Sequence, residues 1–179
     1  MDLTRRDVGR MALAAAPAMK LFAKVNSTFG GVTIGVITYS SRGTNNLDNI
    51  INTMVKIGVG ECELMSNHAE SGAGAPAAGG APGAQARQGG RFQMTPEMQA
   101  AMKEQQEKLA QWRKTVSMDK FKEVRAKFDK AGINLGLLCY NMRDSMSDDD
   151  IEWGFQMARA LGVKGITTST TVSMSKRIA

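Results

Sequence analysis

The chain has 179 residues, 42% of them hydrophobic, and its 23 Lys and Arg against 17 Asp and Glu give a formal net charge of +6. This length allows one domain of ordinary size. The basic residues between 103 and 130 alternate with acidic ones at helical spacing, which is typical of solvated helix faces. We therefore exclude a nucleic-acid-binding surface, which needs a stripe of positive charge together with polar or aromatic side chains that contact the bases.

Residues 1–23 have the features of an export signal. The pair Arg5-Arg6 precedes a short apolar run from Met11 to Met19, and small residues follow near a plausible cleavage site. Paired arginines ahead of a weakly hydrophobic segment resemble the twin-arginine type, which predicts an exported, periplasmic or secreted protein. The run is too short to span a bilayer, so no stable membrane anchor is expected. An ordinary amphipathic N-terminal helix is the alternative.

From residue 32 onward, expected strands alternate with expected helices. The strands are 32–40, 60–65, 133–140 and 163–170, and the helices are 46–57, 95–114, 117–131 and 147–161. Three amphipathic stretches end at a glycine that passes directly into an apolar run, at Gly58, Gly132 and Gly162. Glycine adopts the left-handed conformation that ends a helix without penalty. Helix, glycine and strand in this order form half of a β-α-β unit, so the sequence predicts a parallel α/β fold.

A second segment unsuited to a core covers about 69–94. It is rich in Gly, Ala and Pro, and it cannot bury enough apolar surface to offset the entropy of ordering it. We expect a flexible insertion between the second strand and the next helix. A tolerated surface loop is favoured over a substrate lid, although the segment follows a strand on the side where α/β ligand sites form.

Ligands of parallel α/β proteins bind at the carboxyl ends of the strands. The polar residues at these ends are therefore the candidates: Tyr39, Arg42, Glu63, Asn67, His68, Tyr140, Asn141, Thr167 and Ser169. Period-two alternation places Glu61 and Glu63 on one face. Since two carboxylates do not fit an apolar helix layer, we assign that face to a barrel interior. The same alternation places Tyr140 on the face of Gly136.

His68 is the only histidine of the chain. A single histidine is more often structural than functional, but its place just beyond a strand makes substrate contact the alternative. A zinc site from this chain alone is not expected, because it needs about three protein ligands and the sequence has no histidine or cysteine pair to supply them. No dinucleotide-binding glycine pattern or phosphate-binding loop follows the first expected strand.

At 29–40 and 58–70, and in its twin-arginine leader, the chain resembles the xylose isomerase-like barrel superfamily, specifically its exported sugar phosphate isomerases/epimerases. The resemblance implies a parallel (β/α) barrel of TIM type, of which residues 24–179 would form about the first four βα units, a half barrel. It also implies proton or hydride transfer next to a sugar carbonyl, assisted by a divalent metal such as Mn, Mg, Co or Zn.

Members of that superfamily bind the metal through Glu, Asp, His and Glu of later strands. Those strands are absent here, so no metal ligand is assigned and the catalytic residues stay unknown. Tyr39, Glu63, His68 and Tyr140 carry over as substrate-side contacts for a small carbohydrate. A half barrel also leaves unpaired sheet edges, which predict either a homodimer that forms a pseudo-barrel or poor solubility.

Three functions are compatible with the sequence. The first is a sugar isomerase/epimerase that is incomplete in this chain. The second is a non-catalytic periplasmic carbohydrate-binding or interaction module that uses the same strand ends. The third is a metal-dependent nuclease of the same barrel type, which the single histidine and the export signal disfavour. A small doubly wound sheet is the structural alternative, and the strand order distinguishes it from a barrel.

Overall fold

A computed structural model describes residues 24–41, 44, 46–76 and 95–179. Its elements are β1 (Thr28–Phe29), β2 (Val32–Thr33), β3 (Gly35–Ile37), the 3-10 helix η1 (Thr38–Ser40), α2 (Leu47–Ile57), β4 (Glu61–Met65), α3 (Ser66–Gly72), α4 (Pro96–Thr115), α5 (Asp119–Lys130), β5 (Asn134–Cys139), α6 (Asp148–Leu161), β6 (Gly165–Thr167) and α7 (Val172–Ile178). The expected export signal, Arg42 and residues 77–94 of the expected insertion lie outside the described residues. Within the described part, no helix has the length and apolar character needed to cross a membrane.

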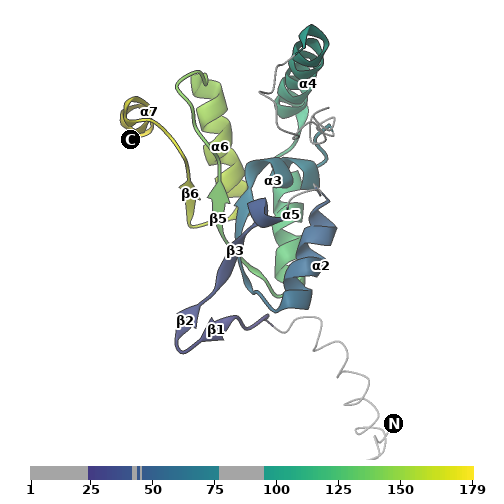
Figure 1. The fold of residues 1–179 in the computed structure, drawn as a ribbon, viewed down its shortest axis with the longest axis vertical. Helices are drawn as coiled ribbons and strands as arrows, with labels where there is room; N and C mark the ends of the chain where they lie inside the picture. Colours follow the sequence, from purple (N-terminus) through teal and green to yellow (C-terminus); the bar gives the residue numbers. More distant parts are fainter. Residues whose placement is uncertain (1–23, 42–43, 45, 77–94) are drawn as a thin grey trace, which may run out of the picture.

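The fold is built on one parallel sheet with the strand order β3-β4-β5-β6 (Figure 1). This confirms the predicted alternation of parallel strands and helices. The strands lie side by side in the order in which they occur in the chain. A doubly wound sheet, in contrast, has a point at which the strand order reverses. Apolar residues of α2, α5 and α6 form a single core with one face of β4 and β5, to which Leu64, Leu135 and Leu138 contribute fully buried side chains.

The helix boundaries follow the predicted capping signals. Asn46 accepts a hydrogen bond from the Asn49 amide at the start of α2, and Ser147 forms a capping box with Asp150 at the start of α6. α2 and α6 both end at a glycine with positive φ, 72° at Gly58 and 63° at Gly162. These ends are the left-handed C-caps that the sequence predicts.

The first expected strand, 32–40, is wrong as a continuous strand. Gly30 and Gly31 have φ values of 56° and 82°, which allows a two-residue hairpin turn, and Phe29 pairs with Val32 across it. Val32 and Thr33 therefore belong to an antiparallel hairpin, and only Gly35–Ile37 joins the parallel sheet. The Ser27 hydroxyl fixes the hairpin to the amino end of the sheet: it accepts from the Gly60 amide at 3.1 Å and donates to the Ile34 carbonyl at 2.7 Å.

The expected insertion begins later than residue 69. Residues 66–72 form α3, in which Ala69 and Glu70 are buried. Ala73, just beyond this helix, is 6% exposed and belongs to the core. Small residues that are typical of a flexible segment are here packed against α2 and α5, because their lack of bulk lets α3 lie close to both helices. Gly72 illustrates this, since a Cβ there would lie 2.6 Å from a Leu47 methyl group.

A β-bulge in β5 changes which face each side chain occupies. Cys62 pairs with Leu135 and Glu63 pairs with Leu137, so Gly136 is an extra residue without a partner in β4. The period-two alternation shifts at this point. Leu138 and Tyr140 consequently lie on the helix-covered face, 0% and 3% exposed. The prediction that Tyr140 shares a face with Gly136 is therefore wrong.

Tyr140 packs directly on Gly154 of α6. A Cβ added at Gly154 would lie 2.5 Å from the Tyr140 ring, closer than any van der Waals contact. We expect Gly154→Ala to lower the free energy of unfolding by about 1–3 kcal/mol, measured by urea denaturation. In the control, Gly165→Ala, the added methyl meets only Leu137 at 3.6 Å, and the change should stay within about 0.5 kcal/mol. Equal effects of the two substitutions would contradict the packing of Tyr140 on α6.

Candidate functional site

The face of the sheet opposite the helices carries the polar side chains. Glu61 and Glu63 of β4 lie on this open face, as the alternation predicts, and both are half-buried. Gly35 and Leu137 flank them on the neighbouring strands, and Leu137 is 38% exposed. These four residues help to line a cavity of about 350 Å³. The open face is therefore a shallow acidic hollow with an apolar margin.

Glu63 is held toward the carboxyl end of the sheet. Its carboxylate accepts a hydrogen bond from the Thr167 hydroxyl of β6, across β5. Cys139 lies beside them in register with Thr167. Burial raises the pKa of the Cys139 thiol, the Thr167 hydrogen bond opposes this rise, and the Glu63 charge adds to it. The thiol is consequently protonated at neutral pH, and the Glu63 carboxyl group is the hydrogen-bond acceptor of this cluster.

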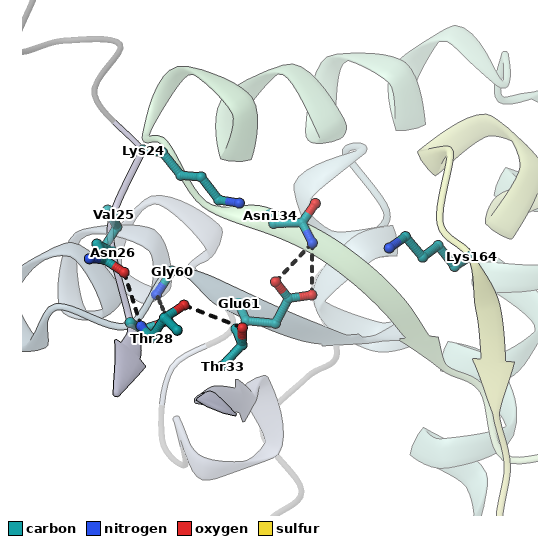
Figure 2. Close-up of a pocket in the computed structure, with 10 residues that line it drawn as sticks. Lys24, Val25, Asn26, Thr28, Thr33, Gly60, Glu61, Asn134 and Lys164 are labelled. Carbon is teal, nitrogen blue, oxygen red and sulfur yellow. Dashed lines mark hydrogen bonds between the residues drawn. The ribbon is translucent and has the colours of Figure 1, made fainter. Parts of the chain in front are cut away.

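Glu61 forms the second polar cluster, toward the amino end of the sheet. Asn134 of β5 donates to both of its carboxylate oxygens, at 2.7 and 2.8 Å. The pair borders a cavity of about 440 Å³ between the sheet and the β1-β2 hairpin. In Figure 2, Lys24 and Lys164 extend toward this pair from two sides. The sequence did not indicate Asn134 or Lys164, because neither follows a strand.

His68 does not face the hollow. Its side chain is buried in the first turn of α3, where Nδ1 lies 2.9 Å from the Thr38 hydroxyl. The same hydroxyl accepts a hydrogen bond from the Met65 amide at 2.9 Å. The imidazole thus joins η1 to the junction of β4 and α3. Of the two alternatives for His68, these contacts favour the structural one.

The other candidates lie around the carboxyl ends of the strands. Tyr39 in η1 is 55% exposed and Asn67 is exposed in α3. Asn141 accepts a hydrogen bond from the Ser169 amide at 2.9 Å, which ties the loop after β5 to the loop after β6. Tyr39 is thus the accessible aromatic group at this edge, whereas Asn141 and Ser169 hold two loops together.

Tyr140 belongs to a network on the helix-covered side that the sequence did not indicate. Its hydroxyl donates to the Asp150 carbonyl at 2.9 Å, and burial raises the pKa of this phenol. Next to it, buried Glu70 accepts from Arg113 Nε at 2.8 Å and from Trp153 Nε1 at 2.9 Å. Arg113 also lies 5.7 Å from the centre of the Trp153 ring. A carboxylate and a guanidinium far apart in sequence are thus paired between α3, α4 and α6.

A divalent metal does not fit the described residues. Among residues 24–41, 44, 46–76 and 95–179, no group of three or more His, Cys, Asp and Glu side chains could hold a metal ion. Beside Glu63, the carboxylate of Glu61 is held by Asn134, and the thiol of Cys139 has a raised pKa. Burial, together with the charges of Glu61 and Glu63, raises the pKa of Cys62 to about 12, so its thiol also stays protonated at neutral pH.

Comparison of the chain with protein-family models, with curated proteins and with solved structures gives no match. The described residues form an α/β fold in which the strands of a four-stranded parallel sheet alternate with helices.

Burial lowers the pKa of His68 below its ordinary value of 6.5. The unfolded chain binds the proton more readily than the folded one, so His68 destabilises the fold as pH falls below about 6.5. We expect the free energy of unfolding to decrease between about pH 7.5 and pH 5.5, and His68→Gln to remove most of this dependence. Because the chain has one histidine, its imidazole NMR signal reports the pKa directly. A measured pKa at or above 6.5 would contradict the buried environment.

Arg113→Met leaves Glu70 buried without its cation. We expect a loss of about 2–4 kcal/mol in the free energy of unfolding, because an uncompensated buried charge is costly. The matched control is Arg159→Met, which breaks the exposed pair with Glu152 and should cost less than about 1 kcal/mol. Adding Glu70→Gln to Arg113→Met removes the stranded charge while Trp153 keeps its acceptor. The double variant should therefore be more stable than Arg113→Met, and the opposite order would refute the assignment.

Proposed function

We propose that this chain forms part of a (β/α) barrel of TIM type that binds a small carbohydrate at the carboxyl ends of its strands, as an exported sugar (phosphate) isomerase/epimerase does. The observation that carries the proposal is the position of Glu63. It is an anionic side chain on the helix-free face of a parallel sheet, held by a threonine two strands away.

The sheet supports the barrel. Barrels of this type have consecutive parallel strands, helices outside and alternating side chains inside. Here the strand order is consecutive, and the core that the helices form lies on one face. The other face carries Gly35, Glu61, Glu63 and Leu137, and a small residue beside two carboxylates and one leucine suits a narrow interior.

The side chains at the carboxyl edge support a carbohydrate ligand. A carboxylate accepts two or more hydrogen bonds and matches the vicinal hydroxyl groups of a sugar. Glu63 offers this group, Thr167 offers a hydroxyl beside it, and Tyr39 offers a partly exposed ring at the same edge. Aromatic rings with one polar end suit a ligand whose faces are apolar and whose rim is polar.

The reaction of such an enzyme is the movement of a proton or hydride next to the sugar carbonyl, for which a divalent metal, Mn, Mg, Co or Zn, supplies polarisation of that carbonyl. The described residues do not hold that metal. Their part is to bind and orient the sugar, with Glu63 as hydrogen-bond acceptor. A non-catalytic periplasmic carbohydrate-binding module is the second candidate, because binding alone needs only hydrogen-bonding groups such as those of Glu63 and Thr167.

Glu63→Gln tests the proposal, because it keeps the shape of the side chain and removes the charge. We expect a panel of aldoses, ketoses and their phosphates to include one ligand that perturbs the NMR signals of Glu63 and Thr167. Glu63→Gln should weaken that ligand roughly tenfold, the effect of one charged hydrogen bond. The control is Glu152→Gln, an exposed carboxylate of α6, which should leave the affinity unchanged.

The same samples in D₂O with added Mg²⁺ or Zn²⁺ separate the two candidates. Deuterium uptake at the carbon next to the carbonyl supports the isomerase/epimerase, and binding without uptake supports the binding module. Absence of sugar binding throughout the panel, or equal affinities of the two variants, would overturn the carbohydrate site at Glu63.

A further inference from the structure

The two outer strands of the parallel sheet have edges without a strand partner in the described part of the chain. β3 pairs only with β4, and β6 pairs only with β5. Both strands are three residues long, Gly-Val-Ile in β3 and Gly-Ile-Thr in β6. Neither contains a charge or a proline, and the bulge of the sheet lies between β4 and β5. Apart from this short length, the features that protect an exposed edge, namely a charge, a proline or a bulge in the edge strand, are absent from both strands.

Apolar side chains lie next to these edges and on the open face. Ile34, just before β3, is 45% exposed, and Leu137 on the open face is 38% exposed. Val172, at the start of α7 after β6, is 76% exposed. One exposed apolar group thus lies beside each edge strand, and one lies on the face between them.

We propose that the occupant of this surface is a second copy of the chain, which pairs its β6 with β3 and its β3 with β6. All four strands run in one direction, so a two-fold axis along the strands joins the edges in parallel. The result is a closed cylinder of eight parallel strands, the number at which side chains fill a barrel interior. Both unpaired edges of each copy are satisfied at once, and the two contacts are equivalent by symmetry.

The charges are complementary in this arrangement. Gly35 of β3 is in register with Glu61, and Lys164 immediately precedes β6. Within one copy, Lys164 extends toward the Glu61–Asn134 pair from the side of β6 (Figure 2). A second copy that pairs its β6 with β3 brings another Lys164 toward the same acidic face from the side of β3, which favours a second copy over an acidic partner.

The inference extends the proposed barrel, but association and sugar binding are measured separately. A dimer that binds no sugar contradicts the proposed function alone. A monomer that binds sugar contradicts this inference alone.

The test is the molar mass of the full chain in solution, measured by light scattering over a range of micromolar concentrations. We expect twice the chain mass. Leu137→Lys puts a charge on the open face and should raise the dissociation constant at least roughly tenfold, the effect of changing a central interface residue. The control is Met102→Lys on α4, an equally exposed apolar position at 45% away from the sheet, which should leave the mass unchanged. Circular dichroism checks that both variants fold.

Hydrogen exchange of the wild-type chain gives a second measurement that needs no substitution. The amides of Gly35–Ile37 and Gly165–Thr167 should be protected in the dimer and should lose protection on dilution. A monomer at every concentration, or a dimer insensitive to Leu137→Lys, overturns the inference. Fast exchange at both edges in the dimer overturns it too, and so does a monomer with both edges protected, because another segment would then cover them.

Discussion

One constraint governs this protein: in the part of the chain that the structure describes, helices cover a single face of the parallel sheet. Parallel sheets are normally buried on both sides, because their crossover helices pack on the faces. Here Leu64, Leu135 and Leu138 are sealed under α2, α5 and α6, whereas Leu137 stays partly open to water. The open face therefore has to be an interior in a larger arrangement or a wet surface of its own. Its two carboxylates and flanking glycine suit a narrow, wet interior.

The bulge at Gly136 determines which residues of β5 lie on the helix-covered face and which lie on the open face. Before it, Asn134 faces Glu61; after it, Cys139 faces Glu63 and Thr167, and Tyr140 is turned under α6. Without the extra residue, Tyr140 would open toward the hollow and Cys139 would lie in the core. The separation of Tyr140 from Glu63 removes one of the substrate contacts that the resemblance implied. The carbohydrate site that we propose therefore has fewer contacts than the resemblance implies, with Glu63, Thr167 and Tyr39 at its edge.

Local signals predicted the elements, and long-range contacts decided the rest. The caps at Asn46, Ser147, Gly58 and Gly162 depend on neighbours within one turn, so the sequence was sufficient for them. The bulge depends on the register of β5 against β4, which no period-two pattern within β5 reports. Glu70 and Arg113 are 43 positions apart, and the small residues around Glu70 indicated flexibility. Their pairing became visible only once α3, α4 and α6 were placed together.

Two glycines next to Glu61 explain why the sheet accommodates a carboxylate near its amino end. A Cβ at Gly35 would lie 3.1 Å from the Glu61 Cβ, and a Cβ at Gly136 would lie 2.6 Å from its Oε1. Because both neighbours lack a side chain, the Glu61 side chain lies along the sheet and reaches Asn134 instead of projecting outward. A carboxylate lying flat needs little height above the strands. Strands that face each other across an eight-stranded cylinder leave little space between them, so the two glycines fit the barrel that we propose.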